Sequence, residues 1–260
     1  GTTSPSSDVS MQGVQAGVDL FVNNRWNAGI YAGQMQSDSR VEGMYGLSFF
    51  NRVFAGNARS DNVYLGGYAT YANPQGQYAD FVLQYGHHDV TVTPVSGLVT
   101  DSDGNSLTAS AEVGQRFALG GGWGVEPQAQ LIFNQQHMGN ALITGALVSQ
   151  DAASTAIGRL GVRITGDFVT GLGRLAPYAR LNVWHGFSGT DNATFIGPAG
   201  VATIGNGIGY TSTEAAVGLT LALSPKASVY GELGKLFHNG GSDAQVSSSV
   251  EGSVGIKVKF

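Results

Sequence analysis

The 260-residue sequence contains no cysteine. A disulfide scaffold, a thiolate metal site and a cysteine nucleophile are therefore excluded, whereas an envelope protein that folds without disulfides is compatible with this composition. The sequence also has no uninterrupted apolar run near the ~20 residues that a transmembrane helix needs. A helical membrane protein is therefore excluded as well.

Charged residues are scarce, at 12% of the sequence against the roughly 25% that soluble globular proteins carry. The formal net charge is −5, so no basic stripe is available to neutralise phosphates, and we expect no nucleic-acid partner. Glycine is abundant, with 40 residues, about twice the average share. Low charge and high glycine content favour strands that face lipid on one side.

The dominant pattern is an alternation of apolar and polar residues with a period of two, which predicts β-strands. It is clearest at the C-terminus, where Val254, Ile256, Val258 and Phe260 alternate with Ser253, Gly255, Lys257 and Lys259. Repeated in segments of about ten residues, apolar-out and polar-in alternation is typical of a transmembrane β-barrel. A soluble β-sandwich alternates too, so the alternation alone does not separate the two folds.

Charged residues of both signs fall on the polar phase of the predicted strands. A barrel lumen could satisfy them with one another and with water. The pore-lining candidates chosen by this phase are Glu112, Glu126, Arg159, Arg163, Arg180, Glu214, Glu232 and Lys257.

Eleven strands are predicted, and the connections between them alternate in length. The predicted strands are 12–23, 26–36, 61–73, 77–90, 105–119, 123–137, 154–166, 174–187, 209–223, 226–238 and 248–260. Short turns built on Gly, Pro or Asn alternate strictly with long polar connections, centred on 37–60, 91–104, 138–153, 188–208 and 239–247. Short periplasmic turns and long extracellular loops are the arrangement of outer-membrane barrels, so we expect an all-β, antiparallel transmembrane barrel.

The odd strand count predicts a missing strand. The last strand follows a long loop, which places the C-terminus in the periplasm. Bacterial single-chain barrels have an even number of strands and so leave no free edge. We therefore expect a first strand upstream of this chain, residues 1–11 as a polar extracellular loop, and the barrel over 12–260. The alternative is a missed strand near Tyr45 to Phe50.

Several segments resemble the β-domains of pertactin-type autotransporters. They are Gly66 to Tyr71, Gln77 to Gln84, Glu126 to Leu131, Gly158 to Arg163 and Pro177 to Arg180, and Glu126-Pro127-Gln128-Ala129-Gln130 is the most specific. The resemblance covers nearly the whole chain from residue 12. It implies a twelve-stranded barrel threaded by a helix, of which this chain lacks the helix and the first strand. It also implies a translocator in the Gram-negative outer membrane that anchors and exports its own N-terminal passenger.

The last strand also resembles the signal that the barrel-assembly machinery recognises. Ser253, Gly255, Val258 and Phe260 match that pattern, and a regularly alternating strand is a good template for edge pairing. The partners expected are therefore outer-membrane lipids and lipopolysaccharide, the assembly machinery and the passenger. We expect no cofactor, no metal and no enzymatic activity.

Two other functions share these features. A small outer-membrane channel or porin would have the same composition but no passenger. An outer-membrane hydrolase would need a catalytic set near the long loops, where His137, His185 and His238 lie, but no Gly-x-Ser-x-Gly elbow accompanies them. Adjacent His87 and His88 point to opposite faces of a strand, so a shared metal ion is not expected.

Overall fold

The computed structural model describes residues 6–43, 53–95, 97–143, 146–150, 153–187, 190–197, 200–207, 209–240 and 249–258. Tyr45 to Phe50, where a further strand was considered, lies outside these ranges, as does Phe260. No helix long and apolar enough to cross a bilayer occurs in the part of the chain that is described.

A single antiparallel sheet of long strands dominates the molecule. Its strand order is β1-β2-β3-β4-β5-β7-β10-β12-β15-β16-β17. These eleven strands are β1 (Ser6–Val22), β2 (Trp26–Gly43), β3 (Val53–Ala72), β4 (Gln77–Pro94), β5 (Thr100–Gln115), β7 (Trp123–Met138), β10 (Ala153–Gly166), β12 (Gly173–Gly186), β15 (Tyr210–Ala222), β16 (Ala227–Gly240) and β17 (Ser249–Val258). Each strand pairs with the next along this path, which confirms the eleven strands predicted from the alternation.

Two short strands extend the sheet at the end that carries the short turns. β6 (Phe117–Gly120) pairs with β7, and β11 (Phe168–Thr170) pairs with β12. Gly120, Gly121 and Gly122 all have positive φ, at 88°, 59° and 83°, a conformation that glycine adopts without steric cost. This glycine run makes the tight connection from β6 to β7.

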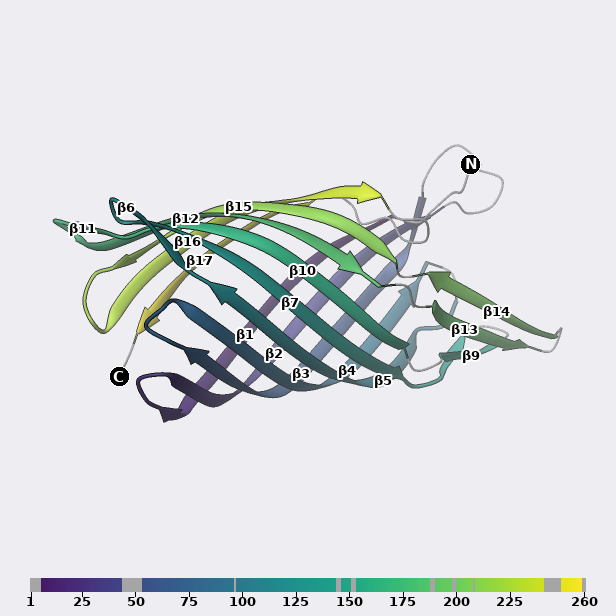
Figure 1. The fold of residues 1–260 in the computed structure, drawn as a ribbon. Coiled ribbons are helices and arrows are strands. Elements are labelled where there is room, and N and C mark those ends of the chain that lie inside the picture. The colour runs from purple at the N-terminus through teal and green to yellow at the C-terminus, as the bar shows by residue number, and fades with distance from the viewer. Residues whose placement is uncertain are drawn as a thin grey trace.

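A second, four-stranded sheet occupies two of the connections that were predicted to be loops. Its order is β14-β13-β9-β8, with β8 (Ala141–Ile143), β9 (Ala146–Gln150), β13 (Thr190–Gly197) and β14 (Gly200–Gly207). It projects from the end of the main sheet opposite the short turns (Figure 1). The long connections predicted over 138–153 and 188–208 therefore contain strands, and they pair with each other through β9 and β13.

The main sheet curls around a central space (Figure 1), and it has no second apolar layer to pack against. Within the described residues, the only buried apolar side chains are Val148 and Ala216. Large apolar side chains on one face of the strands are instead exposed, such as Leu160 at 69% and Val254 at 82%. A sandwich would bury this face between two sheets, so the exposed apolar face indicates contact with lipid.

The two edges of the curled sheet remain separate. β1 pairs with β2 and β17 pairs with β16, and the described residues include no pairing between β1 and β17. β1 is exposed over residues 8–22, and β17 is exposed over residues 250–258 apart from the half-buried Gly255. Backbone donors and acceptors along each edge are therefore free to pair with a further strand.

Several strands are longer than predicted. β1 begins at Ser6, so residues 6–11 belong to a strand and not to the predicted loop. β2 continues to Gly43, β3 begins at Val53 and β4 continues to Pro94. The β2 extension carries polar side chains on both faces, with Ser37 and Ser39 on one and Asp38 and Arg40 on the other, so there the apolar alternation stops before the backbone pairing does.

Candidate functional site: the polar inner face of the sheet

Contacts between strands that are not neighbours show which face of the sheet is concave. Arg159 on β10 and Glu112 on β5 are separated by β7, yet Nη2 and Oε2 lie 2.7 Å apart. Arg180 on β12 and Glu232 on β16 are separated by β15, and their ion pair spans 2.8 Å. Side chains converge on a concave face and diverge on a convex one. The polar phase of the strands is therefore the inner face.

Arg180 is the centre of one inner-face cluster. Its Nη2 contacts Glu214 Oε1 at 2.6 Å and Glu232 Oε1 at 2.8 Å. The second oxygen of Glu214 accepts hydrogen bonds from Trp184 Nε1, at 2.9 Å, and from Asn182 Nδ2, at 3.2 Å. Each carboxylate thus has a cation and further donors, the condition under which charges tolerate partial burial.

Arg159 is the centre of a second cluster, next to the first. Glu112 accepts a hydrogen bond from Tyr78 Oη at 2.6 Å in addition to its ion pair with Arg159. The Arg159 guanidinium lies 5.3 Å from the centroid of the Trp184 ring, within cation–π range. Since Trp184 also donates to Glu214, the two clusters join. The charged band formed by both clusters extends from Tyr78 on β4 to Glu232 on β16.

The other predicted pore-lining residues also lie on the inner phase. Arg163 stacks on Tyr178, with 4.2 Å between the guanidinium carbon and the ring centroid. Glu126 is opposite Arg163 in the β7–β10 register and accepts a hydrogen bond from Gln128 Nε2 at 2.7 Å. Lys257 is exposed and opposite Ser228 on β16. The structure thus brings Glu112, Arg159, Arg180, Glu214 and Glu232 into one band, whereas Lys257 lies apart from it near the free edge.

The sequence analysis missed the uncharged members of the charged band. Tyr78, Trp184 and Asn182 all bond to its carboxylates. They lie on the same polar face of their strands as the charged residues. The alternation could therefore have identified them, but it was applied to charged residues alone.

Hydrogen-bonded polar groups line the inner face from β1 to β4, among them the carboxylates of Asp19 and Asp80, which accept from Tyr68 Oη and Thr70 Oγ1. Tyr31 Oη donates to Gln84 Oε1 at 2.9 Å, and Tyr64 Oη contacts Gln15 Oε1 at 3.1 Å. Each tyrosine passes over a glycine in the strand between. A Cβ on Gly66 would lie 2.4 Å from Cζ of Tyr31. The inner-face ion pairs of the described residues, in contrast, join side chains on β5 to β16.

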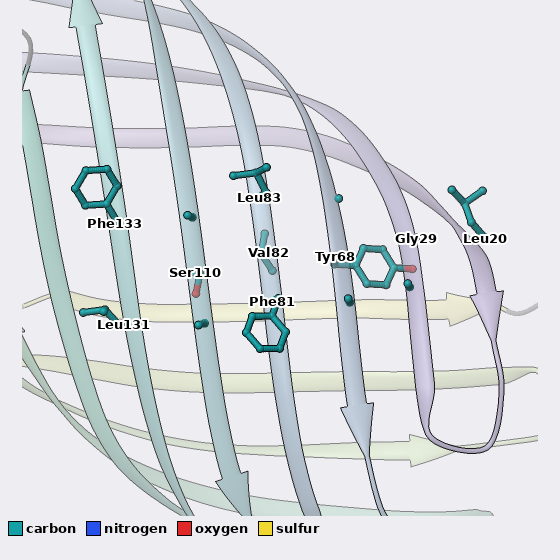
Figure 2. Close-up of a pocket in the computed structure, with 14 residues that line it drawn as sticks. Leu20, Gly29, Tyr68, Phe81, Val82, Leu83, Ser110, Leu131 and Phe133 are labelled. Carbon is teal, nitrogen blue, oxygen red and sulfur yellow. The ribbon is translucent and has the colours of Figure 1, made fainter.

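The outer face carries an apolar hollow over β1 to β7 (Figure 2). Larger side chains, among them Leu20, Phe81, Leu83, Leu131 and Phe133, surround small ones such as Ala69 and Ala111. Figure 2 shows the labelled side chains spread over neighbouring strands rather than closing over the hollow. A shallow apolar surface of this kind suits acyl chains better than a polar ligand.

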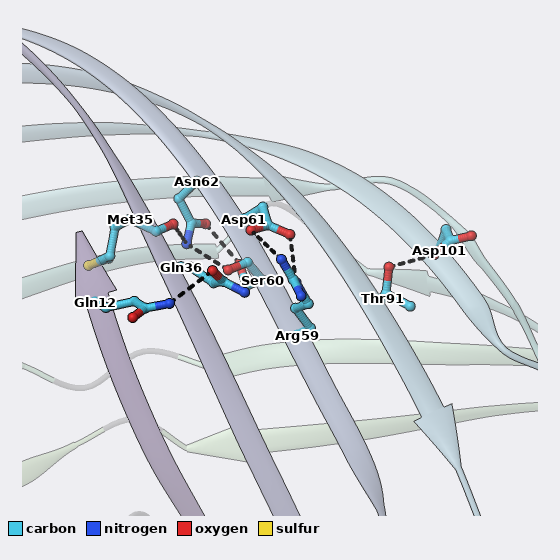
Figure 3. Close-up of polar contacts among 9 residues, drawn as sticks. All are labelled: Gln12, Met35, Gln36, Arg59, Ser60, Asp61, Asn62, Thr91 and Asp101. Atoms are coloured by element: carbon cyan, nitrogen blue, oxygen red, sulfur yellow. Dashed lines mark hydrogen bonds and ion pairs between the residues drawn. The ribbon is translucent and has the colours of Figure 1, made fainter. Parts of the chain in front are cut away.

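The outer face becomes polar toward the end of the long connections. Leu65, Tyr85 and Leu107 lie opposite one another across β3, β4 and β5. Four residues farther toward the long connections, Asp61, Asp89 and Asp103 form the corresponding row. Figure 3 shows Asp61 paired with Arg59, at 3.0 Å between Oδ2 and Nε, in this polar region. The change from apolar to acidic side chains between the two rows indicates where the apolar part of the outer face ends.

The histidines of the hydrolase alternative do not form a catalytic set in the described structure. His137 lies on β7 opposite Asn105, and His185 Nδ1 contacts Thr211 Oγ1 at 3.0 Å. His238 lies on β16 opposite Ser212. Groups of three or more His, Asp or Glu side chains able to hold a metal ion do not occur among the described residues.

Comparison with known proteins identifies a family. The family model described as the autotransporter β-domain matches residues 1–234. The pertactin autotransporter of Bordetella bronchiseptica is 28% identical over 232 residues, which cover 86% of this chain and 24% of that protein. The BrkA autotransporter of Bordetella pertussis is 28% identical over 241 residues, 86% of this chain and 22% of that protein. The chain thus spans about a quarter of the length of these curated relatives.

Solved structures show the same fold. The β-domain of the Bordetella autotransporter BrkA has a TM-score of 0.70 at 22% identity, and the match covers 98% of this chain and 92% of that one. The translocator domain of the autotransporter NalP from Neisseria meningitidis has a TM-score of 0.71 at 14% identity, covering 98% and 81%. At these identities the likeness establishes a shared fold.

Proposed function

The chain belongs to the autotransporter β-domain family, and from this membership we propose that it anchors an N-terminal passenger domain in the outer membrane and exports it to the cell surface. The observation that carries the proposal is the polar inner face inside a sheet whose outer face is apolar. Ion pairs join five of the eight predicted pore-lining charges, Glu112 to Arg159, and Glu214 and Glu232 to Arg180. A passing polypeptide would therefore meet a hydrated wall that does not bind it tightly.

We propose that the short turns face the periplasm and the long connections face the outside. β17 ends at the short-turn side, so the C-terminus would be periplasmic. The apolar outer face would contact lipid acyl chains, and the polar rows beyond Leu65 and Tyr85 would meet lipopolysaccharide head groups. This orientation agrees with the family's short periplasmic turns and longer extracellular loops.

We further propose that the free edges of β1 and β17 have distinct partners. A strand upstream of this chain would pair with both edges and close a twelve-stranded barrel. During assembly, the β17 edge would be read by the barrel-assembly machinery through Ser253, Gly255, Val258 and Phe260. Ser253 lies opposite Glu232 and Gly255 opposite Tyr230. A Cβ on Gly255 would lie 2.3 Å from Cζ of Tyr230, so the glycine accommodates the tyrosine ring on the inner side of the edge strand.

The test is surface exposure of an epitope tag in the full-length parent protein, placed directly upstream of the barrel and probed on intact cells. We expect exposure, and we expect its loss when residues 253–260 are deleted, because the barrel then fails to assemble. A barrel that is correctly inserted but keeps its tag in the periplasm would contradict export and favour a channel.

The absence of cysteine allows a direct test of the route. Ser110 and Ala111 are neighbours on β5 that lie on the inner and outer phases, respectively. A single cysteine at Ser110→Cys should form a disulfide with a cysteine in a stalled passenger, whereas Ala111→Cys should not. Equal cross-linking from both positions would contradict passage along the inner face.

A further inference from the structure

Three inner-face side chains on β3, β4 and β5 form a hydrogen-bonded relay outside the charged band. His88 Nε2 lies 2.7 Å from Ser106 Oγ, and His88 Nδ1 lies 2.6 Å from Asn62 Oδ1. Asn62 is directly opposite His88 in the β3–β4 register. We propose that Ser106, His88 and Asn62 form a nucleophilic site in which His88 activates the Ser106 hydroxyl toward small carboxylic esters.

The orientation of the Asn62 amide determines the state of the histidine. Asn62 is 7% exposed, and its Nδ2 donates to the carbonyl oxygen of Met35 at 3.2 Å. Its Oδ1 also accepts a hydrogen bond from Ser60 Oγ at 2.8 Å (Figure 3). Because Oδ1 is an acceptor only, the proton of a neutral His88 lies on Nδ1. Nε2 is then free to accept the proton of Ser106, the arrangement that a general base requires.

A glycine on β4 lies beside the nucleophile and its base. Gly86 is on the same face of β4, and a Cβ there would lie 2.9 Å from Ser106 Oγ and 3.3 Å from His88 Nε2. A larger residue at this position would push Ser106 and His88 out of their present contact. Ser106 and His88 are both half-buried, not enclosed. They lie near the level where the outer face turns polar.

A hydrogen-bond donor lies on the other side of Ser106 from His88. Gln136 on β7 is directly opposite Ser106 in the register. Its Nε2 contacts Met138 Sδ at 3.3 Å, and a thioether is a weak acceptor. An amide nitrogen carries two N–H groups, so Gln136 can donate to the oxygen that becomes negative in the tetrahedral intermediate.

The proposed reaction has two balanced steps. Ser106 Oγ forms a bond to the ester carbonyl carbon while its proton moves to His88 Nε2, and the alcohol leaves with that proton, which gives an acyl-serine. Water then attacks the acyl carbon, again losing a proton to His88, and Ser106 regains its proton as the acid leaves. Asn62 acts as a positioning residue because, within the relay, it contacts His88 and not Ser106. This activity lies outside export and differs from the expectation of no enzymatic activity.

The experiment is labelling of the full-length protein, folded in outer membranes, with a fluorophosphonate probe. Attack by Ser106 forms a P–O bond, breaks the P–F bond and releases fluoride, and mass spectrometry locates the adduct. We expect an adduct on Ser106 that is absent in Ser106→Ala and unchanged in Ser110→Ala. Ser110 is a matched inner-face serine on β5 that accepts a hydrogen bond from Gln130 Nε2.

Variants of His88 and Asn62 test whether the histidine activates the Ser106 hydroxyl or has only a structural role. His88→Gln should slow labelling by about 100-fold or more, the usual contribution of a general base. Asn62→Leu should slow it too, whereas Asn62→Asp, which keeps an acceptor for Nδ1–H, should restore it. A folded barrel without an adduct at Ser106, or with labelling unaffected by His88→Gln, would overturn the proposal. Normal folding of every variant is checked by heat-modifiable migration.

Discussion

Arg180 lies between two carboxylates that face the same interior. Its guanidinium contacts both Glu214 and Glu232, and these acids also bond to Trp184, Asn182 and Tyr178. Without the arginine, two partly buried carboxylates would face each other with only neutral donors. Removing one partner of such a pair is destabilising mainly because the other charge then stays buried without a counter-charge.

Arg180→Met should therefore lower the free energy of unfolding by about 2 kcal/mol, within the range found when a hydrogen-bonded charged group loses its partner. Adding Glu232→Gln should recover part of this loss, because one of the two unpaired charges is removed. Urea unfolding in lipid vesicles measures both effects. A double variant less stable than Arg180→Met would contradict the explanation.

At the scale of a strand, alternate glycines let tyrosines from the neighbouring strand lie flat on the inner face. Gly66 and Gly67 are consecutive on β3 but face opposite sides of the sheet. A Cβ on Gly66 would lie 2.4 Å from the Tyr31 ring, whereas the nearest atom to a Cβ on Gly67 is a backbone oxygen at 3.7 Å. The same residue type thus has different roles one position apart.

Gly66→Ala should destabilise the sheet by about 1–3 kcal/mol, the usual cost of overpacking, while Gly67→Ala should be close to neutral. Tyr31 must rotate away in the first variant and lose its hydrogen bond to Gln84. The midpoint of urea unfolding in lipid gives the comparison. Equal effects at both positions would show that backbone entropy, not the tyrosine contact, decides the outcome.

At the scale of the whole molecule, lipid covers the outer apolar face of the sheet, where a soluble fold would pack a second layer of protein. The outer face exposes its apolar side chains, and the interior is polar and charged, so burial of apolar area depends on the bilayer. Leu160 is a suitable position to test this dependence on the bilayer, because it lies near the middle of β10 and is 69% exposed.

Leu160→Arg should cost about 2–4 kcal/mol in a bilayer, as charged side chains do at the midplane of a barrel's lipid face. Leu172→Arg is the matched control, because Leu172 is 76% exposed in the connection between β11 and β12 and should tolerate the charge. Unfolding in vesicles measures both. A Leu160→Arg variant as stable as the control would argue against membrane insertion of this face.

The sequence by itself determined the strands, their faces and the alternation of short and long connections. These features follow from local physics: alternation reports which side chains face lipid, and glycine, proline and asparagine mark the tight turns. The charged candidates Arg159, Arg180 and Glu214 were found for the same reason, since their phase is a property of each strand alone.

Only the tertiary structure decided which distant residues meet. The polar extension of β2 lacks an apolar signal, and its pairing with β3 depends on the register between the two strands. The pairing of β9 with β13 and the contact of Asn62, His88 and Ser106 likewise join segments far apart in the sequence. Register and curvature place such side chains together, and neither is encoded in the alternation of a single strand.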